Sequence, residues 1–110
     1  MPFAPSDSDL CEIRRRDGRL DEAAAHGRRA VALDPGDPVG WYNLGVVLYD
    51  RLEIAASIAC ERRAIRLAPD APGPHFELAE GLLLSGQWEE GWREYEGRWR
   101  LPGLPPLIPP

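Results

Sequence analysis

The sequence predicts an all-α fold: a solenoid of helical hairpins with three repeats and about six helices. One observation behind this prediction is a period of 34 residues, which divides the chain without gaps into rows 4–37, 38–71 and 72–105. The other is that apolar residues within each row recur at the three-and-four spacing of a helix face. Hairpins of this length stack on one another because a single hairpin cannot bury its apolar face.

The period is visible as columns of similar residues. Pro35 and Pro69 lie 34 residues apart and close the phrases AVALDPGDP and AIRLAPDAP. One column keeps an apolar side chain in every row: Leu10, Leu44 and Leu78. Another keeps small residues, which let two helices cross closely: Cys11, Gly45 and Ala79. The third row fades after about Leu101, so we expect a repeat domain over 1–101 (third repeat 72–101) and a proline-rich tail or linker remnant over 102–110.

Helix starts and turns follow from local signals. Pro38 and Pro72 stand at first helical positions, where the missing N–H costs nothing. Ser6 has an acid three residues later, as in a capping box. Gly18 and Gly86 fall between the helices of their rows, where a positive φ is expected. The register therefore predicts turns near residues 17–18, 35–37, 51–52, 69–71 and 85–86.

Two rows depart from this pattern. Row one carries Asp7 and Arg14 where large apolar residues are expected, which predicts a short and frayed first helix. Row two carries Leu52 in place of a turn glycine, and Glu61 where an aromatic residue is usual. We expect these two changes to loosen local packing without threatening the fold.

Bulk composition narrows the classes of function. A formal net charge of −5 argues against nucleic acid, because phosphate binding needs a basic surface. No apolar run approaches the roughly 18 residues of a membrane span, and the acidic N-terminus is unlike a signal peptide. We therefore expect a cytoplasmic protein that binds neither nucleic acid nor membrane. Two cysteines, Cys11 and Cys60, are too few for a disulfide framework.

Row two resembles the tetratricopeptide repeat (TPR), a family of protein-binding scaffolds. The matching residues are Trp41, Leu44, Gly45, Ala64 and Pro69, and the resemblance covers about residues 4–101. It implies a TPR-type solenoid whose first helices line a concave, peptide-binding face. Row three, GQWEEGWREYEGRWRLPG, has a narrower resemblance to the last repeat of a bacterial family with TPRs ahead of a glycosyltransferase domain. That catalytic domain is absent from this sequence.

The sequence contains no recognisable catalytic constellation. Its only histidines are His26 and His75, and phosphate loops, nucleophile elbows and paired-cysteine motifs are missing. We expect no enzyme activity, no cofactor and no metal site. The leading interpretation is a protein–protein interaction scaffold. The alternatives are a docking or regulatory segment of a glycosyltransferase, and a self-associating structural module.

Two surfaces are candidates for binding. The concave face is expected to prefer peptides with basic and apolar residues, and its proposed members are Glu12, Tyr42, Asn43, Val46, Tyr49, Asp50, Phe76, Glu77 and Glu80. The second surface is an aromatic stripe on the last helix, formed by Trp88, Trp92, Tyr95 and Trp99. Trp88 and Tyr95 are expected to pack inward. We expect another surface to cover Trp92 and Trp99. The candidates are the proline tail, a following domain, or a second copy of the chain in a homodimer.

Overall fold

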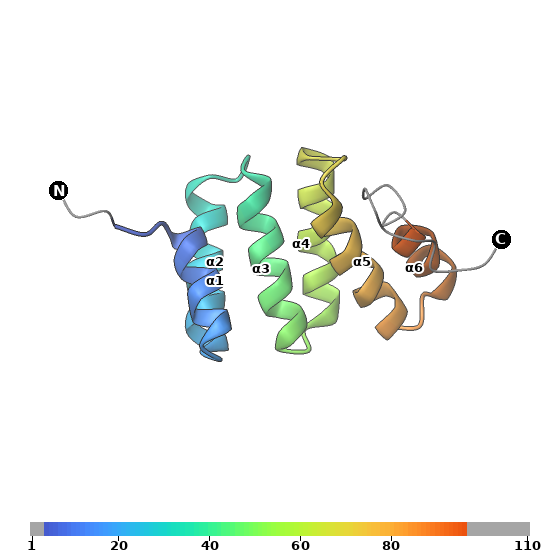
Figure 1. Ribbon diagram of the computed structural model, residues 1–110, viewed down its shortest axis with the longest axis horizontal. Coiled ribbons are helices and arrows are strands. Elements are labelled where there is room, and N and C mark those ends of the chain that lie inside the picture. Colours follow the sequence, from blue (N-terminus) through green and yellow to red (C-terminus); the bar gives the residue numbers. More distant parts are fainter. Residues whose placement is uncertain (1–3, 97–110) are drawn as a thin grey trace, which may run out of the picture.

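The computed structural model describes residues 4–96 and places six helices in them. They form three hairpins: α1 (Asp7–Arg16) with α2 (Leu20–Leu33), α3 (Pro38–Asp50) with α4 (Ile54–Leu67), and α5 (Pro72–Leu84) with α6 (Trp88–Tyr95). The hairpins follow one another along an elongated body of 54 × 28 × 25 Å (Figure 1). The predicted all-α, TPR-type solenoid is confirmed. Trp99 and the proline tail lie outside the described residues.

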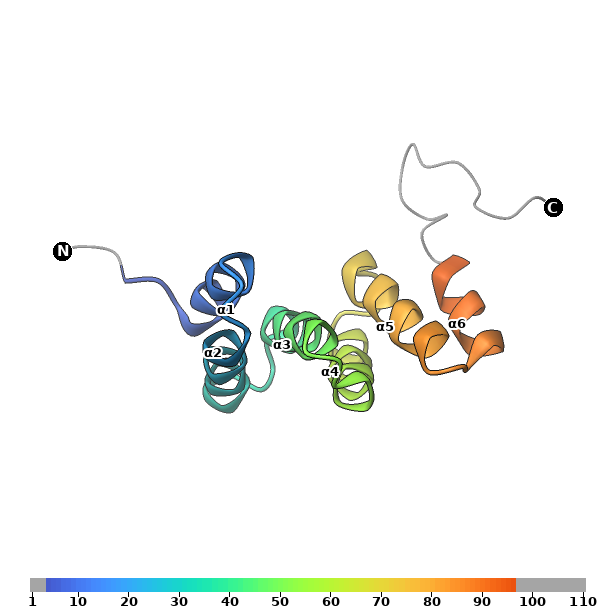
Figure 2. The same cartoon turned by 90° about the horizontal axis from the view of Figure 1, so that it is seen from below.

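The first helices of the hairpins lie along one side of the body. Figure 2 shows α1, α3 and α5 on this side, with α2 and α4 behind them. Contacts run from α1 to α3 and from α3 to α5, and α2 and α4 each pack against the first helix of the next hairpin. The arrangement gives the chain one continuous face made of first helices.

All five predicted turns are present. Gly18 and Gly86 take positive φ values of 79° and 86°. Leu52 occupies the same repeat position and also has a positive φ, 64°, in a region that leucine adopts only at a cost. The backbone of this turn is therefore set by the repeat and not by the residue that occupies it.

The core is made of the columns that were predicted to be apolar or small. Leu44 and Leu48 cluster with Cys60, and Val31 and Trp41 pack against them. The small column, Cys11, Gly45 and Ala79, is buried in all three rows. Burial raises the pKa of both cysteine thiols to about 11. They are therefore protonated near neutrality, and such buried thiols pack like small apolar groups.

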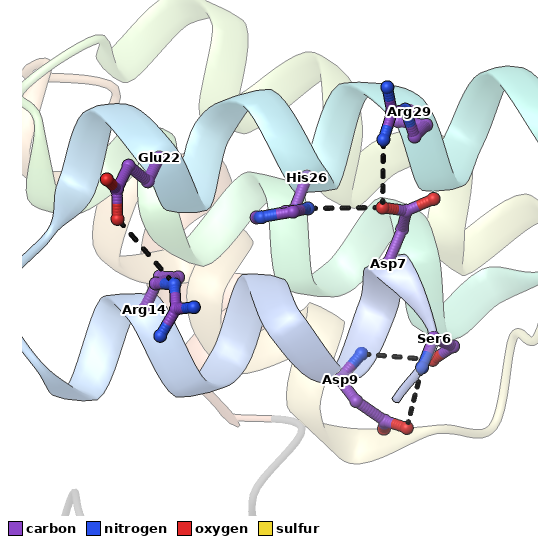
Figure 3. A network of polar contacts seen from close by, with 7 residues as sticks. All are labelled: Ser6, Asp7, Asp9, Arg14, Glu22, His26 and Arg29. Atoms are coloured by element: carbon purple, nitrogen blue, oxygen red, sulfur yellow. Dashed lines mark hydrogen bonds and ion pairs between the residues drawn. The ribbon is translucent and has the colours of Figure 1, made fainter. Parts of the chain in front are cut away.

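The first hairpin is held by polar contacts where apolar ones were expected (Figure 3). Asp7 Oδ1 lies 3.1 Å from His26 Nδ1, and Arg14 Nε lies 3.6 Å from Glu22 Oε2. The start of α1 is closed by a capping box between Ser6 and Asp9. α1 is shorter than α3 and α5, ten residues against thirteen. The prediction of a short first helix is confirmed, and its start carries a cap and polar contacts that oppose fraying.

None of the helices in the described range 4–96 is long and apolar enough to cross a membrane. Within the same range, no group of three His, Cys, Asp or Glu side chains is placed to hold a metal ion.

Candidate functional site: the face of α1, α3 and α5

A pocket of about 160 Å³ opens on the face made by the first helices. α3 crosses between α1 and α5, so its side chains form the floor and the two neighbouring helices form the walls. The residues that line the pocket are Glu12, Arg15, Tyr42, Asn43, Val46 and Glu77. Five of these six are residues that the sequence assigned to the groove. We call this cavity the acidic pocket.

A second, more open hollow lies further along the same two helices. It is lined by Tyr49, Glu80, Leu83 and Leu84. Burial, and after it the carboxylate of Glu80, raises the pKa of the Tyr49 hydroxyl, so side chains of α3 and α5 meet at this point. Leu84 is largely exposed. We call this surface the apolar hollow, and it supplies the hydrophobic surface that the acidic pocket lacks.

Charge on this face is mainly negative. Burial, with help from Glu80 and Asp50, raises the pKa of Glu77 to about 7, while Arg15 opposes that rise. Arg15 is the one basic residue among those lining the acidic pocket. Its nearest recorded carboxylate is that of Asp50, at 3.8 Å between Nη1 and Oδ2. Glu12 in turn pairs with Arg16 of the same helix, with 2.8 Å between Oε1 and Nη2. The acids Glu77 and Glu80 therefore leave the face with an excess of negative charge over these two arginines.

Asn43 already makes a contact within the protein. Its Nδ2 donates a hydrogen bond of 3.3 Å to the backbone carbonyl of Ser8, which ties α3 to α1. An asparagine on a peptide-binding face is expected to bond the backbone of a bound peptide. The amide has a second N–H and an acceptor oxygen that could still serve that purpose.

Two predicted members of the groove lie outside the acidic pocket and the apolar hollow. Asp50 is exposed at the end of α3 and pairs with Arg15. The Phe76 ring lies 6.0 Å from the Tyr95 ring in an edge-on arrangement, so Phe76 packs toward α6. The structure thus moves one aromatic side chain from the groove floor to the interior of the third hairpin.

Glu61 is the residue of this region that sequence reasoning undervalued. It is completely buried on α4, and neither of its carboxyl oxygens has a hydrogen-bond partner within residues 4–96. Burial, with a smaller contribution from Glu77, raises its pKa to about 10. The carboxyl group is therefore neutral near pH 7. An acid in a column that normally holds an aromatic residue was the available signal.

The aromatic stripe on α6 is partly open to solvent. Trp88 is 61% exposed and Trp92 is 43% exposed. The Tyr95 ring packs edge-on against both Phe76 and Trp92. The expectation that Trp88 packs inward is wrong, because Trp88 is the first residue of α6 and points away from the hairpin interior. Tyr95 does pack inward.

Comparison with known proteins gives one informative match. The tetratricopeptide repeat-containing protein trd-1 of Caenorhabditis elegans is 30% identical to this chain over 81 residues. The match covers 70% of this chain and 10% of the length of the relative. No protein family model matches the sequence. Together with the stacked helical hairpins, the match supports a TPR-like family for this chain.

Proposed function

We propose that the chain is a protein-binding scaffold whose α1–α3–α5 face receives an extended peptide with basic and apolar side chains. The observation that carries this proposal is the acidic pocket, which Glu12, Tyr42 and Glu77 line together. Aromatic and charged side chains gathered in one concavity are typical of the residues that dominate binding energy at interfaces.

The spacing of the two hollows suits an extended peptide. Val46 and Tyr49 are three residues apart on α3, as are Glu77 and Glu80 on α5, which corresponds to a rise of about 4.5 Å along each helix. Side chains on the same side of an extended strand are about 6.6 Å apart. A basic residue in the acidic pocket therefore places the residue one or two positions away near the apolar hollow.

An array of blocked peptides tests this function. Peptides with arginine or lysine one or two positions from leucine should bind best, and their binding should weaken with salt without vanishing, because the ring contacts are not screened. Asn43→Ala combined with Tyr49→Ala should weaken binding. The matched control is Leu33→Ala, which shortens an exposed leucine on α2, away from this face. A preference for acidic peptides would exclude the proposal.

A second candidate function, self-association, is favoured by the exposed indoles of α6. Glu89 and Arg93 flank Trp88 and Trp92 on the same helix. If two copies pair their α6 helices antiparallel about a two-fold axis, Glu89 of one copy faces Arg93 of the other, and the indoles cover each other. Sedimentation should then give twice the mass of 12.3 kDa, and Trp92→Glu should restore the monomer. A monomer at high concentration would exclude this candidate.

The glycosyltransferase-docking alternative rests on the resemblance of row three alone. In that alternative, the covering surface for Trp88 and Trp92 is the domain that follows the repeats. Tryptophan emission that shifts to the blue in a longer chain, compared with residues 1–110 alone, would support it. Unchanged emission would count against it.

A further inference from the structure

The acidic pocket has the chemistry of a receptor for one basic side chain. Glu77 on α5, Glu12 on α1 and Tyr42 on α3 line it together, and one oxygen of Glu12 already pairs with Arg16 at 2.8 Å. Guanidinium and ammonium groups form charge-assisted hydrogen bonds to carboxylates. They are also attracted to the faces of aromatic rings. The pocket volume, about 160 Å³, is large enough for such a group and too small for a folded element.

A buried acid interacts with two of the residues that line this pocket. Glu61 on α4 is fully buried and unpaired within the described residues. Its carboxyl interacts electrostatically with Glu77 and Tyr42, which are both residues of the pocket wall. A buried polar group without a partner is unusual and calls for a reason. Because this carboxyl is neutral near pH 7, it adds no negative charge to the pocket.

The charge of Glu77 depends on its burial and on groups from three helices. From α5 and α3, Glu80 and Asp50 disfavour its ionised form, and from α1, Arg15 favours it. Glu12 on α1 and Tyr42 on α3 also line the pocket, Arg16 pairs with Glu12, and Glu61 on α4 interacts electrostatically with Glu77. Burial is the largest influence, and together these effects bring the pKa of Glu77 to about 7. Near neutrality, about half of the molecules hold a proton on this carboxyl.

We propose that Glu77 receives the guanidinium or ammonium group of a partner's basic side chain, and that this group displaces a proton from the Glu77 carboxyl. This inference rests on the proposed peptide-binding function and adds the receptor residue and its regulation by pH. The balance is simple: the carboxyl O–H gives its proton to solvent, the carboxylate pairs with the incoming cation, and the cation keeps its own charge.

A definite pH dependence follows from this exchange. Only molecules with ionised Glu77 are competent to bind, so the apparent dissociation constant is the intrinsic one divided by the ionised fraction. With a pKa of about 7, the ionised fraction falls about tenfold from pH 8 to pH 6. The affinity for a basic peptide should therefore fall about tenfold over the same interval, although the peptide's own charge does not change.

The test follows the Glu77 carboxyl by carbon-13 NMR in the whole chain, with N-acetyl-arginine amide as the probe. Increasing probe should move the titration midpoint of Glu77 to lower pH. N-acetyl-citrulline amide, which has the same shape without the charge, should leave the midpoint in place. A midpoint that responds to neither probe overturns the inference.

Peptide binding separates this inference from the proposed function. For a peptide selected by the array, Glu77→Gln should weaken binding at pH 8 and remove the pH dependence between pH 6 and 8. The matched control, Glu22→Gln, removes one carboxylate from α2, outside the pocket, and should keep the dependence. Peptides that bind with no response at Glu77 would overturn the inference and leave the scaffold function standing. A response of Glu77 to the arginine probe without any peptide binding would support the cation site at Glu77 and exclude the scaffold function.

Discussion

The carboxyl group of Glu61 fills the space that the missing side chain of Gly45 leaves open. A Cβ atom added to Gly45 would lie 2.6 Å from the Glu61 carboxyl carbon, well inside van der Waals contact. The same two repeat positions hold Cys11 and Gly27 in row one, where a Cβ on Gly27 would lie 3.2 Å from the Cys11 sulfur. In both rows one member is glycine, because the helices approach too closely for two side chains.

This relationship predicts the effect of enlarging Gly45. Gly45→Ala should lower the free energy of unfolding by about 1–3 kcal/mol, the usual cost of overpacking a tight core. The double variant Gly45→Ala with Glu61→Ala should recover part of that loss, since the clash is with Glu61. Urea denaturation of the four chains in the cycle measures the coupling. If Gly45→Ala lowers the free energy of unfolding equally with and without the Glu61 side chain, the clash lies elsewhere.

The buried Glu61 carboxyl also predicts how stability depends on pH. Its pKa in the folded chain is about 10, far above its ordinary value. Between those two values the folded chain holds a proton that the unfolded chain has lost. The contribution is therefore fully present in acid and falls as pH rises. The expected slope is about 1.4 kcal/mol of unfolding free energy per pH unit.

The measurement is best made between pH 7.5 and 8.5. This window lies above the pKa of Glu77 in the folded chain, about 7, and below the ordinary thiol pKa, 9.0, near which the unfolded chain loses its cysteine protons. Glu61→Gln should flatten the slope in this window, while Glu22→Gln, on the exposed surface of α2, should leave it unchanged. A wild-type chain whose stability is constant across the window would contradict the assignment of a neutral Glu61.

Two substitutions at the turn position shared by Gly18, Leu52 and Gly86 are expected to change stability in opposite directions. Leu52 has a positive φ and is 76% exposed, so its side chain contributes little packing. Leu52→Gly should raise the free energy of unfolding by up to about 1 kcal/mol, because it relieves the left-handed strain. Gly18→Ala should lower it by about 1–2 kcal/mol for the same reason. Thermal denaturation of both variants checks this, and a loss of stability in Leu52→Gly would contradict it.

The sequence could predict the hairpins and turns because they depend on period, apolar spacing and local caps. It could not predict which polar residues would pair. Asp7 and His26 meet in row one, and His75 and Glu94 meet in row three at the same two repeat positions, with acid and base exchanged. Each residue alone looks like a departure from the apolar pattern. Only the contact across the hairpin shows that the two departures compensate each other.

Most of the residues that line the acidic pocket could be predicted from the sequence, but the ionisation of their carboxyl groups could not. The columns of the first helices placed Glu12, Tyr42 and Glu77 on one face, and the structure brings them into one pocket. Whether a carboxyl is ionised depends on burial and on neighbours from other helices, which a column does not reveal. Phe76 shows the same limit, since its ring turns toward Tyr95 instead of the groove.

The charge of the partner's side chain can be tested by substituting Arg15, the one basic residue among those that line the acidic pocket. If the occupant is a basic side chain, Arg15 competes with it for the same carboxylates. Arg15→Ala should then strengthen the binding of a basic peptide by about two- to fivefold at low salt, the scale expected for a partly exposed charge. If Arg15 instead grips a carboxylate of the partner, the same substitution should weaken binding.

The experiment is best done at pH 8, where Glu77 is mostly ionised. Arg15 favours the ionised form of Glu77, so its removal shifts that titration to higher pH and would mask part of the gain at pH 7. Anisotropy of a labelled basic peptide, measured at low and at physiological salt, gives the affinity. The matched control is Arg29→Ala, which removes a charge from α2 outside the pocket. Tighter binding in Arg15→Ala alone, lessened by salt, identifies a basic occupant, whereas weaker binding would exclude one.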